Sequence, residues 1–198
     1  MLAQMAESTP AAAQDPVQGP WEGFASAHTW IYTKHRWWHL IPRPINAAVP
    51  ADGIAPLGLD SPCHVLTAYN PGGRAAAEVD NRAAARALRA DPRLDGLVLL
   101  PSLGGHPDGA WLEPRVAVIG LSRHQAQLLG QAYGQLAVYE VDGTIRRVVA
   151  CDRDRVLVQA VVCQHERQPP TPTPSPRPLP AQRRGDLDHG AQPRRPPA

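Results

Sequence analysis

Strand-forming and helix-forming segments follow one another in a regular order between residues 63 and 141, and turn signals separate them. The segments are strands at 63–69, 96–101, 115–121 and 135–141, and helices at 75–90 and 122–134. In this order, two helices cover one face of an antiparallel sheet. The sequence therefore predicts an α+β fold, a ferredoxin-like β-α-β-β-α-β sandwich.

Both predicted helices have recognisable ends. The first stops at Asp91-Pro92, because proline cannot continue the hydrogen-bond ladder of a helix. The second begins with a capping box formed by Ser122 and Gln125, and it ends at Gly134, a typical C-cap residue. The stripe expected to pack the first helix against the sheet consists of Val79, Ala83, Ala87 and Leu88.

Additional strands are predicted on both sides of this core. TIRRVVAC (144–151) forms a hairpin with the preceding strand through Asp142-Gly143, a favoured two-residue turn. VLVQAVVC (156–163) adds a strand at the edge of the sheet. Near the N-terminus, residues 29–33 and 37–41 are rich in β-forming side chains and predict two further strands.

The two ends of the chain differ in composition from the middle. Residues 1–20 have no periodicity and predict a disordered leader. Residues 168–198 contain ten of the 23 prolines together with arginine pairs, and predict a disordered, extended tail. Between them we expect a tryptophan-rich N-terminal extension at 21–62 and the α+β domain at 63–167, which together are long enough for one hydrophobic core.

Charge and cysteine content argue against several classes of protein. The net charge of +2 does not indicate a globally basic nucleic-acid binder. The three cysteines form an odd set without CxxC spacing, unlike a disulfide framework or a zinc knuckle. The N-terminal residues lack a signal-peptide pattern, and no window of about 18 apolar residues occurs. We therefore expect a cytoplasmic protein without membrane association.

The loop Asn70-Pro71-Gly72-Gly73-Arg74 has two interpretations. A glycine-rich turn that leads into a helix presents backbone N–H groups and the positive end of the helix dipole, and Arg74 adds a charged donor, so the loop has features of an anion site. The loop is neither a Walker loop nor a GxGxxG fingerprint. Alternatively, Asn70 and Pro71 form a turn in which the glycines supply positive φ angles. In that case Asn81 is expected to hydrogen-bond back to the loop.

A second group of candidate residues lies around Trp111 and Glu113. On a strand these two side chains share one face, where an aromatic ring and a carboxylate would hold a planar ligand. The alternative is a tryptophan that covers the sheet and a solvated Glu113. Gln135 either caps the end of the second helix or faces the ligand.

Metal-binding and catalytic signatures are weak. His35 and His39 are four residues apart, but they lie in a β-favouring segment that lacks a third ligand, so no metal is expected. No GxSxG motif occurs, and Glu113 has no evident carboxylate partner. We therefore expect no catalytic residue and no cofactor. The alternative is a hydrolase that uses Glu113.

Aromatic and basic residues alternate in the N-terminal extension. The tryptophans are Trp21, Trp30, Trp37 and Trp38, and the basic residues between and after them are Lys34, His35, Arg36, His39 and Arg43. This pattern is found in single-stranded nucleic-acid binders, but it is also typical of a strand that packs its aromatic side chains inward, which is the interpretation we favour.

Several of these motifs resemble a bacterial family known only as a domain of unknown function. The pattern HVLTAYNPGGR, Asn81, PDGAWLEP, AVIGLS and AYGQLAVYE carries the resemblance over residues 63 to about 151. The matching positions are Thr67, Tyr69, Asn70, Pro71, Gly72, Asn81, Trp111, Glu113, Tyr133 and Gln135. The resemblance implies a small intracellular bacterial domain and assigns no role to any residue.

We expect a small non-catalytic ligand-binding or regulatory domain that holds a small anionic or planar ligand. An RNA or single-stranded DNA binder is the alternative partner class, and dimerisation through a sheet edge stays open. The ligand-binding residues are predicted to be Asn70, Gly72, Gly73, Arg74, Trp111, Glu113 and Gln135.

Overall fold

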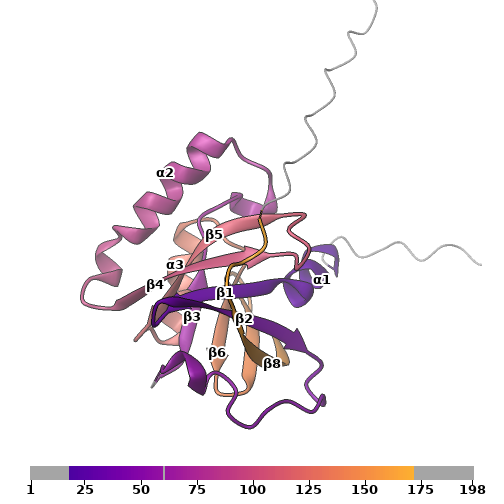
Figure 1. Ribbon diagram of the computed structural model, residues 1–198. Helices are drawn as coiled ribbons and strands as arrows, with labels where there is room; N and C mark the ends of the chain where they lie inside the picture. Colours follow the sequence, from indigo (N-terminus) through magenta and orange to yellow (C-terminus); the bar gives the residue numbers. More distant parts are fainter. Residues whose placement is uncertain (1–17, 60, 172–198) are drawn as a thin grey trace, which may run out of the picture.

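Eight antiparallel strands form a closed barrel in the computed structural model, which describes residues 18–59 and 61–171 (Figure 1). Their order around the barrel is β1-β2-β8-β7-β6-β3-β5-β4, and β4 pairs again with β1. The strands are β1 (His28–Thr33), β2 (Arg36–Arg43), β3 (Cys63–Leu66), β4 (Val98–Gly105), β5 (Leu112–Ile119), β6 (Ala137–Asp142), β7 (Ile145–Ala150) and β8 (Val156–Glu166). The helices are α1 (Gln18–Ser26), α2 (Glu78–Arg89) and α3 (Arg123–Ala132), with short 3-10 turns at Ala55–Leu57, Pro71–Gly73 and Pro92–Leu94.

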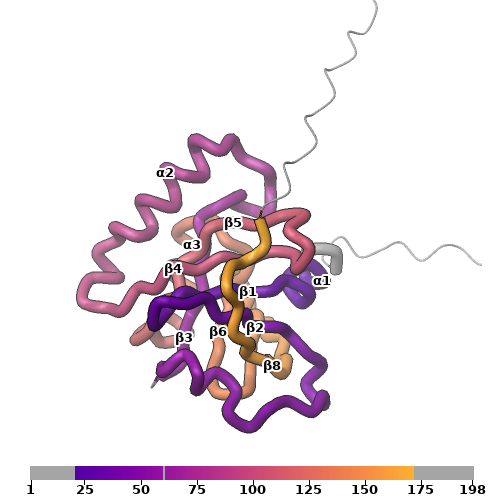
Figure 2. The backbone as a smooth tube through the Cα atoms, in the orientation of Figure 1, coloured from indigo at the N-terminus to yellow at the C-terminus, as the bar shows by residue number. Residues whose placement is uncertain are grey.

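The predicted ferredoxin-like sandwich is wrong. Strands β6, β3, β5 and β4 are neighbours, but the edges of this four-stranded sheet are not open, because β4 pairs with β1 and β6 pairs with β7. The β1–β2 hairpin also lies along β8, near the other end of the described chain (Figure 2). The tryptophan-rich segment thus closes the barrel, and the face expected to be an open platform becomes the barrel lumen.

Most of the local predictions agree with the structure. The strands expected at 29–33 and 37–41 are confirmed as β1 and β2. The capping box of Ser122 and Gln125 is present at the start of α3, and Gly134 has the positive φ of 67° expected after the end of a helix. The β6–β7 hairpin forms with Gly143 and Thr144 as its turn residues, one position later than predicted.

The orientation of α2 differs from the prediction. The side chain of Val79 is 71 % exposed, and Ala83 and Ala87 are exposed as well. The buried residues of this helix are Asn81 and Leu88. Alanines occur around much of the helix and specify a buried face weakly. The buried face of α2 is determined by Leu88, which packs on the barrel, and by the hydrogen bonds of Asn81 described below.

Two apolar clusters occupy the two faces of the barrel wall, because successive side chains of a strand point to opposite faces. Val65, Ala117 and Val148 belong to the cluster in the lumen. Leu66, Val116 and Val149 belong to the second cluster, which α2 and α3 cover from outside. No helix in the described part of the chain is long and apolar enough to span a membrane.

Helix α1 packs at one end of the barrel. Trp21 is buried with the lumen residues, and the guanidinium of Arg155 lies 4.3 Å from the centre of its ring. At the end of α1, the carbonyls of Phe24 and Ala25 accept hydrogen bonds from Arg146 of β7. The leader predicted for 1–20 therefore contains the start of a helix at Gln18, while residues 1–17 and most of the predicted tail lie outside the described residues.

Candidate functional site

A pocket of about 220 Å³ opens at the end of the barrel next to α1. Its apolar wall is formed by Phe24, Tyr69, Trp111 and Leu136. Its polar lining consists of Asn70, Gly73, Glu113, Arg115 and Gln135. Five of the seven sequence-predicted ligand residues therefore line one pocket, and Gly72 and Arg74 do not.

The loop Asn70 to Arg74 is a tight turn whose backbone donors are already used. The N–H of Gly72 donates to the carbonyl of Gly134 at 2.7 Å, and the N–H of Gly73 donates to the carbonyl of Asn70. Both glycines have positive φ angles, 67° and 70°. Helix α2 starts four residues after Arg74 and has Glu78 and Asp80 in its first turn. The turn interpretation therefore holds, and these backbone groups are not available to an anion.

Two asparagines fix the shape of this turn. The N–H of Asn70, a residue with a φ of 51°, donates to Asn81 Oδ1 at 2.8 Å, and Asn81 Nδ2 donates to Asn70 Oδ1 at 3.1 Å. Asn70 Oδ1 also accepts a hydrogen bond from the N–H of Ala76. The predicted bond from Asn81 back to the loop is confirmed. Asn81 holds the loop on α2 and so positions one wall of the pocket.

Replacing Asn81 with alanine is expected to lower the free energy of unfolding by about 2 kcal/mol, because the polar groups of Asn70 lose their partner in a largely buried place. Urea unfolding at neutral pH measures this change. The exposed Asn46 provides a matched control, and Asn46→Ala should change stability by less than about 0.5 kcal/mol. Equal stability of the two variants would contradict the role given to Asn81.

Gln135 connects the end of α3 to the pocket wall. Its Nε2 donates to the carbonyl of Tyr69 at 3.1 Å and to that of Tyr133 at 3.3 Å, so it caps a carbonyl beyond the helix end while it lines the pocket. The preceding residue, Gly134, lies against Pro71, whose Cβ would be only 2.8 Å from a Cβ at position 134. These contacts explain why residues far apart in the sequence meet at this end of the barrel.

Trp111 and Glu113 lie near the rim of the barrel on the lumen side. The side chain of Trp111 is 43 % exposed, so one part of it covers the pocket and another part contacts solvent. Glu113 Oε1 accepts hydrogen bonds from Arg115 Nε at 3.3 Å and Nη2 at 3.0 Å. The alternating pattern predicted that Trp111 and Glu113 share a face; both line the pocket, and Trp111 lies one residue before β5 begins.

Arg115 is the charged one among the four pocket residues that the prediction missed; the others are Phe24, Tyr69 and Leu136. It is 5 % exposed, and its guanidinium occupies the space beside Gly104, where a Cβ would lie 2.0 Å from Arg115 Cζ. Its Nη1 is buried and has no hydrogen-bond partner among the described residues. The signal was present in the sequence, because the period-two rule that pairs Trp111 with Glu113 also includes residue 115.

A second buried arginine lies near the first. The guanidinium carbons of Arg115 and Arg146 lie 4.8 and 4.3 Å from the ring centre of Tyr139. Burial, together with the charge of Arg115, lowers the pKa of Arg146 to about 10. Burial also opposes the charge of Arg115, yet Tyr139 and Glu113 raise the pKa of that arginine overall. The two shifts differ because Arg115 has a carboxylate partner, whereas the hydrogen-bond acceptors of Arg146 are neutral.

The tryptophan-rich segment contributes mainly to packing. Trp21 and Trp30 are buried, and Trp37 and Trp38 are partly buried. Trp30 stacks on His39 at 4.5 Å, and its Nε1 donates to Glu166 at 2.6 Å. The segment therefore does not present four exposed rings in a row, as a single-stranded nucleic-acid platform would.

His39 belongs to a hydrogen-bonded chain on the barrel wall. Its Nδ1 lies 2.8 Å from Glu166 Oε1, and its Nε2 lies 2.7 Å from His28 Nδ1. Burial and the neighbouring His39 lower the pKa of His28 to about 4, so His28 is neutral at pH 7. This chain ties β1, β2 and β8 together. In the described part of the molecule, no group of three His, Cys, Asp or Glu side chains is placed to hold a metal ion.

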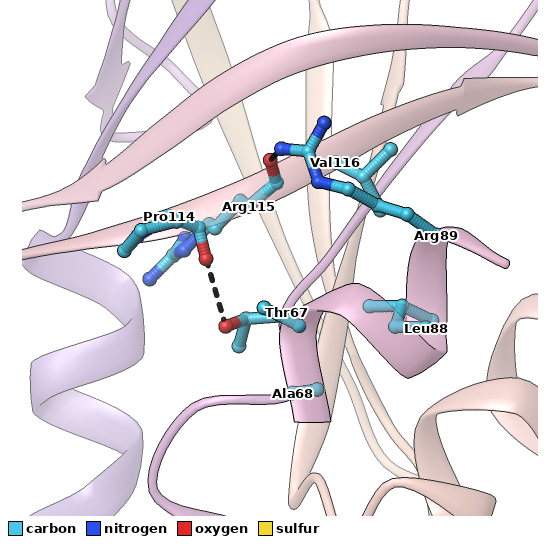
Figure 3. Close-up of a pocket in the computed structure, with 8 residues that line it drawn as sticks. Thr67, Ala68, Leu88, Arg89, Pro114, Arg115 and Val116 are labelled. Carbon is cyan, nitrogen blue, oxygen red and sulfur yellow. Dashed lines mark hydrogen bonds between the residues drawn. The ribbon is translucent and has the colours of Figure 1, made fainter. Parts of the chain in front are cut away.

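The seam between α2 and β5 also contains a cleft, but one of only about 10 Å³ (Figure 3). Thr67 Oγ1 donates to the carbonyl of Pro114 at 3.1 Å, and Arg89 Nη2 donates to the carbonyl of Arg115 at 3.0 Å. This space is about that of one water molecule. The seam therefore attaches α2 to the barrel, and the pocket at the barrel end is the larger of these two spaces.

Comparison with known proteins gives a similarity to one family and no activity. The family model described as "Protein of unknown function (DUF3293)" matches residues 66–138, less than half of the chain. No curated protein and no solved structure matches the chain. The matched stretch contains eight of the nine pocket residues, from Tyr69 to Leu136. Over residues 66–138, the chain is thus similar to a family of proteins of unknown function.

Proposed function

We propose that the barrel binds a small planar or anionic molecule in the pocket at its α1 end, without changing it chemically. The observation that carries this proposal is the convergence of Asn70, Trp111, Glu113 and Gln135, from separate elements, on one pocket. Aromatic walls with a small number of convergent polar groups are typical of small-molecule sites. The volume of about 220 Å³ is smaller than that of most drug-sized sites, which favours a small ligand.

A binding role agrees better with the pocket than a hydrolytic one. Glu113 is held by Arg115, and no second carboxylate lines the pocket in the described part of the chain. Acid–base hydrolysis by a pair of carboxylates would need such a partner. The aromatic wall, in contrast, provides stacking surface with little chemistry of its own.

A ligand screen with two tryptophan variants tests the proposal. The full chain is tested by thermal shift against nucleotides, amino acids, sugar phosphates, aromatic acids and short single-stranded RNA and DNA. We expect a small molecule to raise the melting temperature by mass action, and Trp111→Ala to weaken its binding at least tenfold by removing one wall of the pocket.

Trp37→Ala is the matched control, since Trp37 is partly exposed and packs on Tyr32 of β1, outside the pocket lining. Equal loss in both variants, or binding of nucleic acids alone with a steep dependence on salt, would refute the proposal.

A further inference from the structure

The barrel lumen below the pocket contains more positive than negative charge. Two guanidiniums, those of Arg115 and Arg146, lie over the ring of Tyr139, and the carboxylate near them is that of Glu113. All three of Arg115, Tyr139 and Arg146 are at least 95 % buried. A buried charge without a counter-charge is costly, so this arrangement favours a bound anion.

Three buried polar atoms of this group have no hydrogen-bond partner among the described residues: Arg115 Nη1, the Tyr139 hydroxyl and Arg146 Nε. Buried polar groups are normally hydrogen-bonded, so three such atoms around one ring need an explanation. Two of them belong to guanidiniums, which only donate; the hydroxyl can accept from these guanidiniums, but its own hydrogen then still lacks an acceptor. What is missing is therefore an acceptor.

The guanidinium of Arg115 has one nitrogen left for such an acceptor. Its Nε and Nη2 are used by Glu113 and its Nη1 is not, while Arg115 itself lines the pocket. A ligand in the pocket therefore lies next to a buried charged side chain that has an unused donor. Resting on the proposed function, we infer that the ligand is a small aromatic monocarboxylic acid whose carboxylate enters the lumen toward Arg115 and Tyr139.

The charge and the size of the site define this class of ligand. Two guanidiniums and one carboxylate leave one positive charge, which a monoanion neutralises and a phosphate dianion exceeds. The pocket's aromatic wall, Tyr69 and Trp111, suits the ring of such an acid. Arg146 contributes mainly through its charge, because its other donors are held by Phe24, Ala25 and Gln159.

The inference is tested by calorimetric titration of the full chain with benzoate, phenylacetate, the methyl esters of both acids, and inorganic phosphate. We expect both acids to bind at least tenfold more tightly than their esters, and more tightly than phosphate. Ester binding equal to acid binding would overturn the inference and leave the proposed function standing. Tighter binding of phosphate would overturn the carboxylate class, and absence of binding by both acids and esters would overturn the inference.

Tyr139→Phe provides the most specific variant, since it keeps the ring below the guanidiniums and removes a buried hydroxyl that lacks a partner. Its melting temperature should equal or exceed that of the wild type, while its affinity for the acid should fall about fivefold and its affinity for the ester should not change. Arg115→Met should abolish the preference for acid over ester. Unchanged acid affinity in both variants would contradict a carboxylate site in the lumen.

Discussion

Replacing Glu113 with glutamine is expected to destabilise the protein by about 3 kcal/mol, although Glu113 lies at the rim of the barrel. The carboxylate is the partner of Arg115, whose side chain is only 4 % exposed and lies within hydrogen-bond distance of it at 3.0 Å. A neutral amide leaves a buried positive charge uncompensated. Denaturant unfolding at neutral pH measures the loss.

A double variant separates this cause from a simple packing defect. Arg115→Met in the Glu113→Gln background removes the uncompensated charge, so the double variant should be more stable than Glu113→Gln alone. Asp152→Asn serves as the control, because Asp152 pairs with Arg153 on the surface and is 59 % exposed. Its stability should change by less than about 1 kcal/mol. A double variant less stable than Glu113→Gln would show that the ion pair is not the source of the effect.

A second large effect on stability is expected when Glu140 is protonated by acid or replaced. Glu140 is buried on the outer face of β6, where it accepts hydrogen bonds from Arg123 at 2.7 and 2.8 Å and from Arg147 at 2.7 Å. The hydrogen bonds from Arg123, together with the charge of Arg147, hold the pKa of Glu140 at about 2, compared with 4.5 for an ordinary glutamate. The ionised carboxylate therefore joins α3 to the barrel wall.

The lowered pKa defines the pH range of the effect. Because the folded-state value lies below the unfolded-state value, the stabilisation is fully present above about pH 5 and is lost as pH falls from about 4.5 to 2. The shift corresponds to about 3 kcal/mol, which we reduce to about 2 kcal/mol because Arg123 is 44 % exposed and solvent screens it.

Glu140→Gln should therefore lower stability by about 2 kcal/mol at pH 7 and show a weaker loss of stability between pH 5 and 2 than the wild type. Urea unfolding at a series of pH values measures both. Glu78→Gln is the matched control, since Glu78 pairs with Arg82 on the surface and is 58 % exposed. Parallel stability curves for the wild type and Glu140→Gln over this pH range would contradict the assignment.

Local sequence signals predicted the helices and strands better than they predicted the tertiary arrangement of these elements. The capping box at Ser122, the strands around Trp30 and Trp38, and the bond from Asn81 to the loop all depend on residues close in sequence or on strong propensities. The burial of α2 was predicted wrongly because its repeated alanines specify a face weakly, whereas Leu88 and Asn81 fix it in the structure.

Part of the candidate site was also predictable, because it depends on residues that are close in sequence. Alternation along a strand placed Trp111 and Glu113 on one face, and the loop motif identified Asn70. Arg115 followed from the same alternation but was not considered. Tyr139 and Arg146 lie on β6 and β7, and no local pattern indicates that their side chains meet Arg115. Gly72 and Arg74 were included for an anion loop, but their backbone N–H groups donate to the carbonyls of Gly134 and Pro71.

The sequence alone determined the approximate positions of the strands and of helices α2 and α3, because capping, turn geometry and side-chain alternation depend on near neighbours. It did not indicate α1. Only the tertiary structure decided that the sheet closes into a barrel. Closure depends on pairs such as Trp30 with Leu103 and Trp38 with His165, which are far apart in the chain. These pairs turn one face of the sheet into a lumen, so the guanidiniums of Arg115 and Arg146 lose contact with water.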